Sequence, residues 1–197
     1  MLSRGGQDPY VDAHDRYRAF REAAYNDVQD RLERHIRNDP KRFILGLRLV
    51  EIDDWAIHEW RRVWRSCHPG EPYDGNFPWD EIFRQIRSTP RRFSLAICAN
   101  GVLYGLAAGM ASRGSDNVTI RFIERRFGSN PLAGLVAPIA IEAAEAYAMV
   151  LGRHRIKLRN PVEGVRQRYL ENGFSLDRSL FGATYLSREV YGHGDSS

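Results

Sequence analysis

The stretch NVTIRFIE at Asn117–Glu124, followed by RRFGSN at Arg125–Asn130, decides how this chain folds. Its first part has the apolar residues and the length of a strand. An alanine-rich helical pattern follows over Leu132–Leu151, and the chain continues with a second strand over His154–Arg159 and a helix that ends in YLENGF at Tyr169–Phe174. Strand, glycine-containing turn, helix and strand form a βαβ unit, and such units bind phosphate groups at the helix N-terminus.

The segments around this unit repeat apolar residues with the periods of helices and strands. Asn100-Gly101 between two apolar runs is a strong β-hairpin signal, and Asp53-Asp54 supplies an N-cap for the helix that follows it. The other predicted elements are an amphipathic helix over Val11–Arg37, a strand over Phe43–Ile52, helices over Trp55–Ser66 and Pro78–Arg87, hairpin strands over Arg92–Ala99 and Val102–Ser112, and antiparallel strands over Phe174–Leu176 and Ala183–Val190.

Size and composition indicate one globular domain. The chain has 197 residues, of which 43% are hydrophobic and 27% charged, and its net charge of +4 comes from a basic set dominated by arginine. An arginine-rich surface favours anionic partners, either the phosphate groups of a small ligand or RNA. No run of 18 apolar residues predicts a membrane helix, and the N-terminus lacks the apolar segment of a signal peptide, so we expect a cytoplasmic protein.

The order of elements from Phe43 onward, together with Tyr169-x-x-x-Gly173-Phe174, resembles the GCN5-related N-acetyltransferases, the GNAT superfamily of acyl-CoA-dependent enzymes. The resemblance implies an α/β (α+β) fold with a mixed, mostly antiparallel central sheet flanked by helices over residues 41–192. Residues 1–40 add a tail and an extra amphipathic helix, which either caps the core or mediates a homodimer. Residues 193–197 are expected to be a mobile tail.

The same resemblance implies that acetyl-CoA is the co-substrate and that the turn after the fourth strand holds its diphosphate. The family signature there is Gln/Arg-x-x-Gly-x-Gly/Ala, and Arg125 and Gly128 match it, whereas Asn130 departs from it. Pro131 follows and has no N–H to offer. Alternatively, Asn130 and Pro131 cap and begin a structural helix that contacts no phosphate. The expected cofactor-binding residues are Ile123, Arg125, Arg126, Phe127, Gly128, Ser129, Asn130 and Asn160.

Two residues are the candidate catalytic groups by resemblance. Tyr169 has the spacing of the family tyrosine that protonates the leaving thiolate of coenzyme A, and the alternative is a core tyrosine on an amphipathic helix. Glu124 ends the fourth strand at the position of the general base in several members, where an apolar cleft would raise its pKa. The alternative for Glu124 is an ion pair with Arg125 or Arg126. The amide near Ile123 would polarise the thioester carbonyl.

Three functions follow from these residues. The first is an acyl-CoA-dependent N-acetyltransferase that transfers an acetyl group to an amine, and the acceptor is not readable from the sequence. The second is a catalytically inactive GNAT-fold binding module, which the departures at Asn130 and Pro131 favour. The third, suggested only by the basic charge, is an acetyltransferase toxin acting on aminoacyl-tRNA. No metal is expected, because Cys67-His68 alone lacks metal-ligand spacing.

Overall fold

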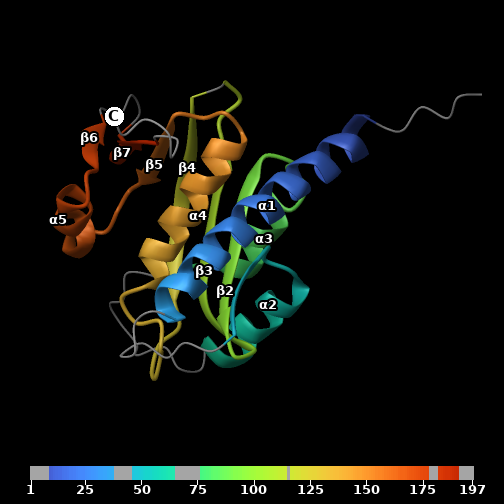
Figure 1. Ribbon diagram of the computed structural model, residues 1–197, viewed down its shortest axis with the longest axis vertical. Helices are drawn as coiled ribbons and strands as arrows, with labels where there is room; N and C mark the ends of the chain where they lie inside the picture. The colour runs from blue at the N-terminus through green and yellow to red at the C-terminus, as the bar shows by residue number, and fades with distance from the viewer. Residues whose placement is uncertain (1–8, 38–45, 65–75, 115, 178–181, 191–197) are drawn as a thin grey trace, which may run out of the picture.

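The computed structural model describes residues 9–37, 46–64, 76–114, 116–177 and 182–190. The elements along these ranges form a seven-stranded sheet with helices on its faces (Figure 1). They are α1 (Pro9–Arg37), β1 (Leu47–Val50), α2 (Asp54–Glu59), the π-helix η1 (Trp60–Trp64), α3 (Trp79–Ile86), β2 (Arg92–Ala99), β3 (Val102–Ala111), β4 (Asn117–Arg125), α4 (Val136–Val150), β5 (Arg155–Arg159), α5 (Glu163–Glu171), β6 (Ser175–Asp177) and β7 (Tyr185–Glu189).

The sheet has the order β1-β2-β3-β4-β5-β7-β6 and is antiparallel except for the parallel pair β4 and β5. The β2–β3 hairpin turns at Asn100 and Gly101, whose φ angles of 49° and 74° are those of the tight turn that this pair of residues favours. The predicted mixed, mostly antiparallel sheet with an additional N-terminal helix is therefore confirmed.

Two apolar clusters hold helices to the two faces of the sheet. One cluster joins α1 and α4 to strands β1 to β5, and these two helices cross the same face side by side (Figure 1). The other joins α2, η1 and α3 to strands β2 and β3, and contains Trp60, Trp64 and Trp79. The alternating strand pattern explains both clusters, because successive side chains point to opposite faces of a sheet.

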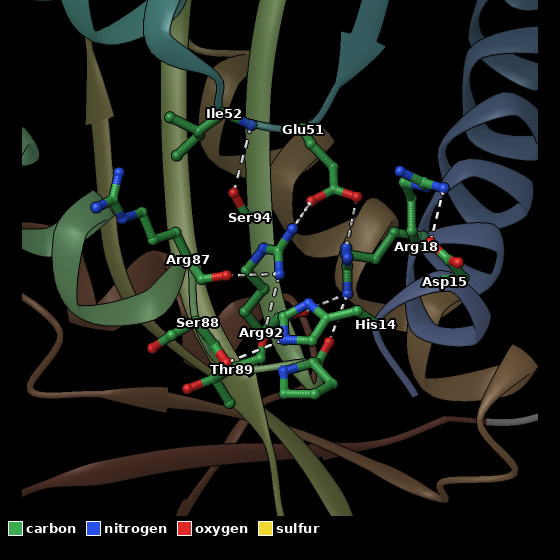
Figure 2. Close-up of polar contacts among 12 residues, drawn as sticks. His14, Asp15, Arg18, Glu51, Ile52, Arg87, Ser88, Thr89, Arg92 and Ser94 are labelled. Atoms are coloured by element: carbon green, nitrogen blue, oxygen red, sulfur yellow. Dashed lines mark hydrogen bonds and ion pairs between the residues drawn. The ribbon is translucent and has the colours of Figure 1, made fainter. Parts of the chain in front are cut away.

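Polar contacts also bind α1 to the sheet. Arg21 is fully buried on α1, and its Nε lies 2.9 Å from Oε1 of Glu51. The other Glu51 oxygen, Oε2, lies 2.8 Å from Nη2 of Arg92, which comes from β2. Figure 2 shows Glu51 in contact with Arg92, and His14 reaching the backbone of Ser88. The N-terminal helix α1 is thus held to the rest of the fold by both polar and apolar contacts.

Several predicted boundaries need correction. The helix predicted from Leu132 begins at Val136, because Gly134 has a left-handed φ of 78° and residues 131–135 form turns. The helix predicted over Trp55–Ser66 is α2 and η1, and Asp53 caps it as expected by accepting the N–H of Ala56 at 2.8 Å. Two strands are shorter in their described parts than predicted, namely β1 and β7. The predicted tail 193–197, most of the N-terminal tail, Cys67, His68 and the beginning of the Phe43–Ile52 strand lie outside the described residues.

Candidate active site

Strands β4 and β5 pair over only part of their length and then diverge. Pairing runs from Asn117 opposite Arg155 to Ile120 opposite Leu158. Just beyond this point β4 has a bulge, since Ala108 of β3 pairs with Phe122 and Gly109 pairs with Ile120, which leaves Arg121 as the extra residue. A bulge bends its strand and interrupts pairing. The second half of β4 is therefore turned away from β5.

Gly109 allows β3 to approach β4 at the bulge. A Cβ atom on Gly109 would lie 2.0 Å from the carbonyl oxygen of Thr119 and 2.9 Å from the Cα of Ile120, which no side chain tolerates without movement of the backbone. The glycine is needed for contact rather than for an unusual φ angle. The position of the bulge, and with it the place where β4 and β5 separate, therefore depends on Gly109.

A cavity of about 770 Å³ occupies the space between the diverging strands and the helices α4 and α5. It is partly open to solvent, and both apolar and charged groups line it. Among the predicted site residues it brings together Ile123, Glu124, Arg125, Asn160 and Tyr169. The others, Arg126 to Asn130, lie outside its lining. Half of the predicted site thus meets around one cavity.

Glu124 is buried, with 5% of its surface exposed, and aromatic residues surround it. Its Oε2 accepts hydrogen bonds from the indole Nε1 of Trp79 at 2.6 Å and from the backbone N–H of Phe77 at 3.2 Å. The rings of Phe77, Trp79 and Phe122 pack edge to face, with centroids 5.1 to 6.4 Å apart. The bonds of Phe77 and Trp79 to Glu124 have no local signal in the sequence, because 47 and 45 positions separate the partners.

Tyr169 faces the cavity from α5. Its ring packs edge to face against Phe174, with centroids 5.9 Å apart, and both belong to the apolar cluster beneath α4. Burial raises the pKa of Tyr169 above the ordinary value of 10.0, and the guanidinium of Arg168 opposes this effect. The phenol therefore stays protonated at neutral pH, which is the state that a proton donor requires.

The turn after β4 is closed by its own side chains. Arg126 continues the ladder by donating its N–H to the carbonyl of Tyr104 at 2.9 Å. Asn130 donates its amide N–H to the carbonyl of Arg126 at 3.2 Å, and its Oδ1 accepts the N–H of Leu132 at 2.8 Å. Asn130 therefore caps a turn and not the helix that was predicted to begin after it, because α4 starts six residues later.

The N-terminus of α4 reaches the cavity directly. Gly134, Val136, Ala137 and Pro138 line it. Within the described residues, the N–H groups of Gly134, Val136 and Ala137 have no acceptor, and proline has no N–H. A helix N-terminus carries a partial positive charge and attracts anions. The signal that marks this start is Pro138, because proline is common in the first turn of a helix.

The lining of the cavity is cationic. It contains five arginines (Arg121, Arg125, Arg159, Arg168 and Arg188) and two carboxylates (Glu124 and Glu142). Arg125 also packs over the ring of Phe127, 5.4 Å from its centroid, and Arg126 over the ring of Tyr104 at 5.6 Å. This excess of positive charge favours an anionic ligand.

Asn160 serves the sheet at the edge of the cavity. Its φ is 47°, its N–H donates to the carbonyl of Thr184 at 2.7 Å, and its Oδ1 accepts the N–H of Thr184 at 2.9 Å. These two bonds extend the pairing of β5 with β7 by one residue. A ligand can therefore use the side-chain N–H groups of Asn160, whereas the side-chain oxygen Oδ1 and the backbone N–H already have partners.

Over the described ranges, no three His, Cys, Asp or Glu side chains gather into a group that could hold a metal ion. The described helices also include none with the length and hydropathy needed to cross a bilayer.

Cys98 is a buried free thiol, and burial raises its pKa to about 11.

The chain matches no family model and no curated protein by sequence. Solved structures with similar folds include the ribosomal-protein-S18-alanine N-acetyltransferase from Escherichia coli, with a TM-score of 0.52 and 14% identity over 77% of this chain and 99% of that one. The aminoglycoside 6'-N-acetyltransferase from Enterococcus faecium has a TM-score of 0.51 and 12% identity, over 75% of this chain and 99% of that one. The PaiA N-acetyltransferase from Thermoplasma acidophilum was solved with coenzyme A. It has a TM-score of 0.50 and 10% identity, over 74% of this chain and 99% of that one.

These similarities extend over about three quarters of the chain and establish the fold. The chain has the fold of the GNAT superfamily, as its order of elements predicts.

Proposed function

We propose that the protein is an acyl-CoA-dependent N-acetyltransferase that transfers an acetyl group to an amine. The observation that carries this proposal is the cavity between the diverging strands, which is lined by both Glu124 of β4 and Tyr169 of α5. Acetyl transfer needs a base for the amine and an acid for the thiolate. The similar fold of PaiA, whose structure contains coenzyme A, supports acetyl-CoA as the co-substrate.

The diphosphate of acetyl-CoA has a suitable binding site at the start of α4. The open N–H groups of Gly134, Val136 and Ala137 supply donors, and Arg125 supplies charge. We therefore assign the diphosphate to the residues 134–137 in addition to the turn predicted for it. Gly128, Ser129 and Asn130 also have N–H groups without an acceptor in the described structure, but Asn130 uses its side chain to close the turn.

The chemistry then proceeds with residues of this chain in defined roles. Glu124 accepts the proton that the amine loses as its nitrogen bonds to the thioester carbonyl carbon. The backbone N–H of Ile123 stabilises the negative charge on the carbonyl oxygen. The carbon–sulfur bond breaks, and Tyr169 donates its proton to the departing thiolate. The products are the acetylated amine and coenzyme A.

The test is the release of coenzyme A thiol from acetyl-CoA in the presence of a panel of amines. We expect Tyr169→Phe and Glu124→Gln each to lower kcat by about 100-fold, which is typical for loss of a general acid or base. Tyr17→Phe and Glu22→Gln, both on α1, are the matched controls, because each makes the same chemical change outside the cavity lining.

Two other outcomes would favour the alternatives. Binding of acetyl-CoA without transfer to any amine would indicate an inactive binding module. A tRNA affinity that falls steeply with salt, together with transfer to aminoacyl-tRNA alone, would indicate the toxin, for which the five arginines of the cavity supply a cationic surface.

A further inference from the structure

The helix that carries Tyr169 gains little from its own packing. None of the residues of α5 is buried. A side chain on such a helix is oriented only as well as the ends of the helix are fixed, since the helix makes few contacts along its length. The position of the Tyr169 phenol therefore depends on the structure at the C-terminal end of α5.

That end is a glycine-terminated cap. Gly173 has a left-handed φ of 81°, and its N–H donates to the carbonyl of Leu170 at 3.1 Å. The N–H of Phe174 donates to the carbonyl of Tyr169 itself, also at 3.1 Å. This pair of bonds is the Schellman arrangement. The ring of Phe174, buried and in contact with the ring of Tyr169, then anchors the cap to the core.

Arg188 of β7 joins this cap to α4. Its Nη1 donates to the carbonyl of Asn172 at 2.8 Å, and its guanidinium lies over the ring of Phe174, 4.7 Å from the centroid. Its Nε and Nη2 donate to Oε1 of Glu145 on α4 at 2.9 and 2.6 Å. One planar group thus contacts the backbone of the cap, the aromatic anchor and a carboxylate of the neighbouring helix, and only arginine has the donors to do so.

We propose that Arg188, held by Glu145, is a positioning residue for Tyr169: it fixes the end of α5 and the ring of Phe174, and so sets where the phenol points into the cavity. The proposal rests on the function given above, which makes Tyr169 the proton donor. Arg188 itself lines the cavity, but each of its three guanidinium nitrogens already donates a hydrogen bond, to Glu145 of α4 or to Asn172 at the end of α5. Its effect on catalysis is therefore exerted through Phe174 and the cap.

The test compares Arg188→Met with a matched control, Arg155→Met. Arg155 lies on β5, pairs with Glu189 of β7 at 2.7 Å, and lies outside the cavity lining. Both variants lose one arginine and its ion pairs, which join Arg188 to Glu145 and Arg155 to Glu189 and Asp116, but only the first changes contacts to the end of α5. The titration of Tyr169 is read from tyrosinate absorbance, as the difference between each protein and the same protein with Tyr169→Phe.

We expect Arg188→Met to move the titration of Tyr169 toward that of an exposed tyrosine and to lower kcat about tenfold, with the KM for acetyl-CoA nearly unchanged. Arg155→Met should leave the Tyr169 titration and kcat as in the wild type. Arg188→Lys should lower kcat less than Arg188→Met does, but should not reach the wild-type value. If Arg188→Met does not fold, Glu145→Gln, which weakens the same anchor, is measured in its place. The absorbance readout needs no activity, so it remains valid if the protein proves not to be an acetyltransferase. An unchanged Tyr169 titration in folded Arg188→Met would overturn the proposal.

Discussion

The indole Nε1 of Trp79 donates a 2.6 Å hydrogen bond to Oε2 of Glu124, and both side chains are buried. Trp79 begins α3 on one face of the sheet, whereas Glu124 lies in the part of β4 that borders the cavity. A buried carboxylate is costly unless it has partners. This bond therefore both stabilises the fold and fixes the carboxylate that we propose as the general base.

We predict that Trp79→Phe costs more than loss of volume alone. The control is Trp64→Phe in the same apolar cluster, where the indole makes only a long 3.4 Å bond to the carbonyl of Leu103. The free energy of unfolding should fall by about 2 kcal/mol more in Trp79→Phe, because a bond to a charged group is lost. The acetyl-transfer rate should fall in that variant only. Equal losses of unfolding free energy in the two variants, measured by urea unfolding, would show that the bond to Glu124 adds no stability of its own.

The bulge in β4 should depend on Gly109. We expect Gly109→Ala to lower the free energy of unfolding by about 3 kcal/mol, since the new methyl group would overlap the backbone of β4. Gly114→Ala is the control, because a Cβ there has no neighbour within 4 Å. Denaturant unfolding measures both. A Gly109→Ala protein as stable as the control would mean that β3 and β4 can separate without cost, and that the glycine does not set the bulge.

The polar network under α1 should also be measurable (Figure 2). Glu51→Gln removes the charge that faces the buried Arg21, and breaking such a pair costs about 3 kcal/mol. Asp15→Asn makes the same change in an exposed pair with Arg18 and should cost less than about 1 kcal/mol. Thermal unfolding of the two variants distinguishes them. If both melt alike, α1 is held by its apolar face alone.

Alkaline pH should destabilise the protein partly through Tyr147. Burial raises the pKa of Tyr147 from 10.0 to about 12, and nearby Arg21 lowers it only in part. The folded state therefore holds the proton more tightly than the unfolded state. Stability from this group is complete below pH 10.0 and is lost as the pH rises to about 12, by about 2 kcal/mol.

The comparison that checks this is Tyr147→Phe, which should lose less stability than the wild type over the same pH range. The difference between the two proteins should be flat below that range. A constant difference from neutral pH to about 12 would contradict the assignment to Tyr147.

The sequence was informative where structure follows from neighbours along the chain. The strands and the Asn100-Gly101 hairpin follow from alternation and turn chemistry, and the cap at Gly173 with the anchor Phe174 follows from the end of a helical pattern. The predicted start of α4 was wrong because Asn130-Pro131 has the same local signal as a helix start. The left-handed Gly134 delays the helix, and Pro138 marks its first turn.

Contacts between distant residues were not predictable from the sequence. Nothing local joins Trp79 to Glu124 or Arg188 to Glu145, and the π-helix Trp60–Trp64 interrupts a pattern that reads as a single helix. The roles of Glu124 and Tyr169 came from family resemblance. The structure adds that both border one cavity, together with the N-terminus of α4.

The central claim is that this cavity binds acetyl-CoA with its diphosphate at the start of α4. Calorimetric titration of acetyl-CoA tests it most directly, with Ala137→Asp as the decisive variant. A carboxylate there favours the helix N-terminus but repels an anion, so folding should be kept. Ala133→Asp, outside the cavity lining, is the control.

We predict a wild-type dissociation constant between about 1 μM and 1 mM, a value typical of enzyme substrates, and at least tenfold weaker binding by Ala137→Asp only. No binding by the wild type at millimolar acetyl-CoA, or equal binding by all three proteins, would contradict the account.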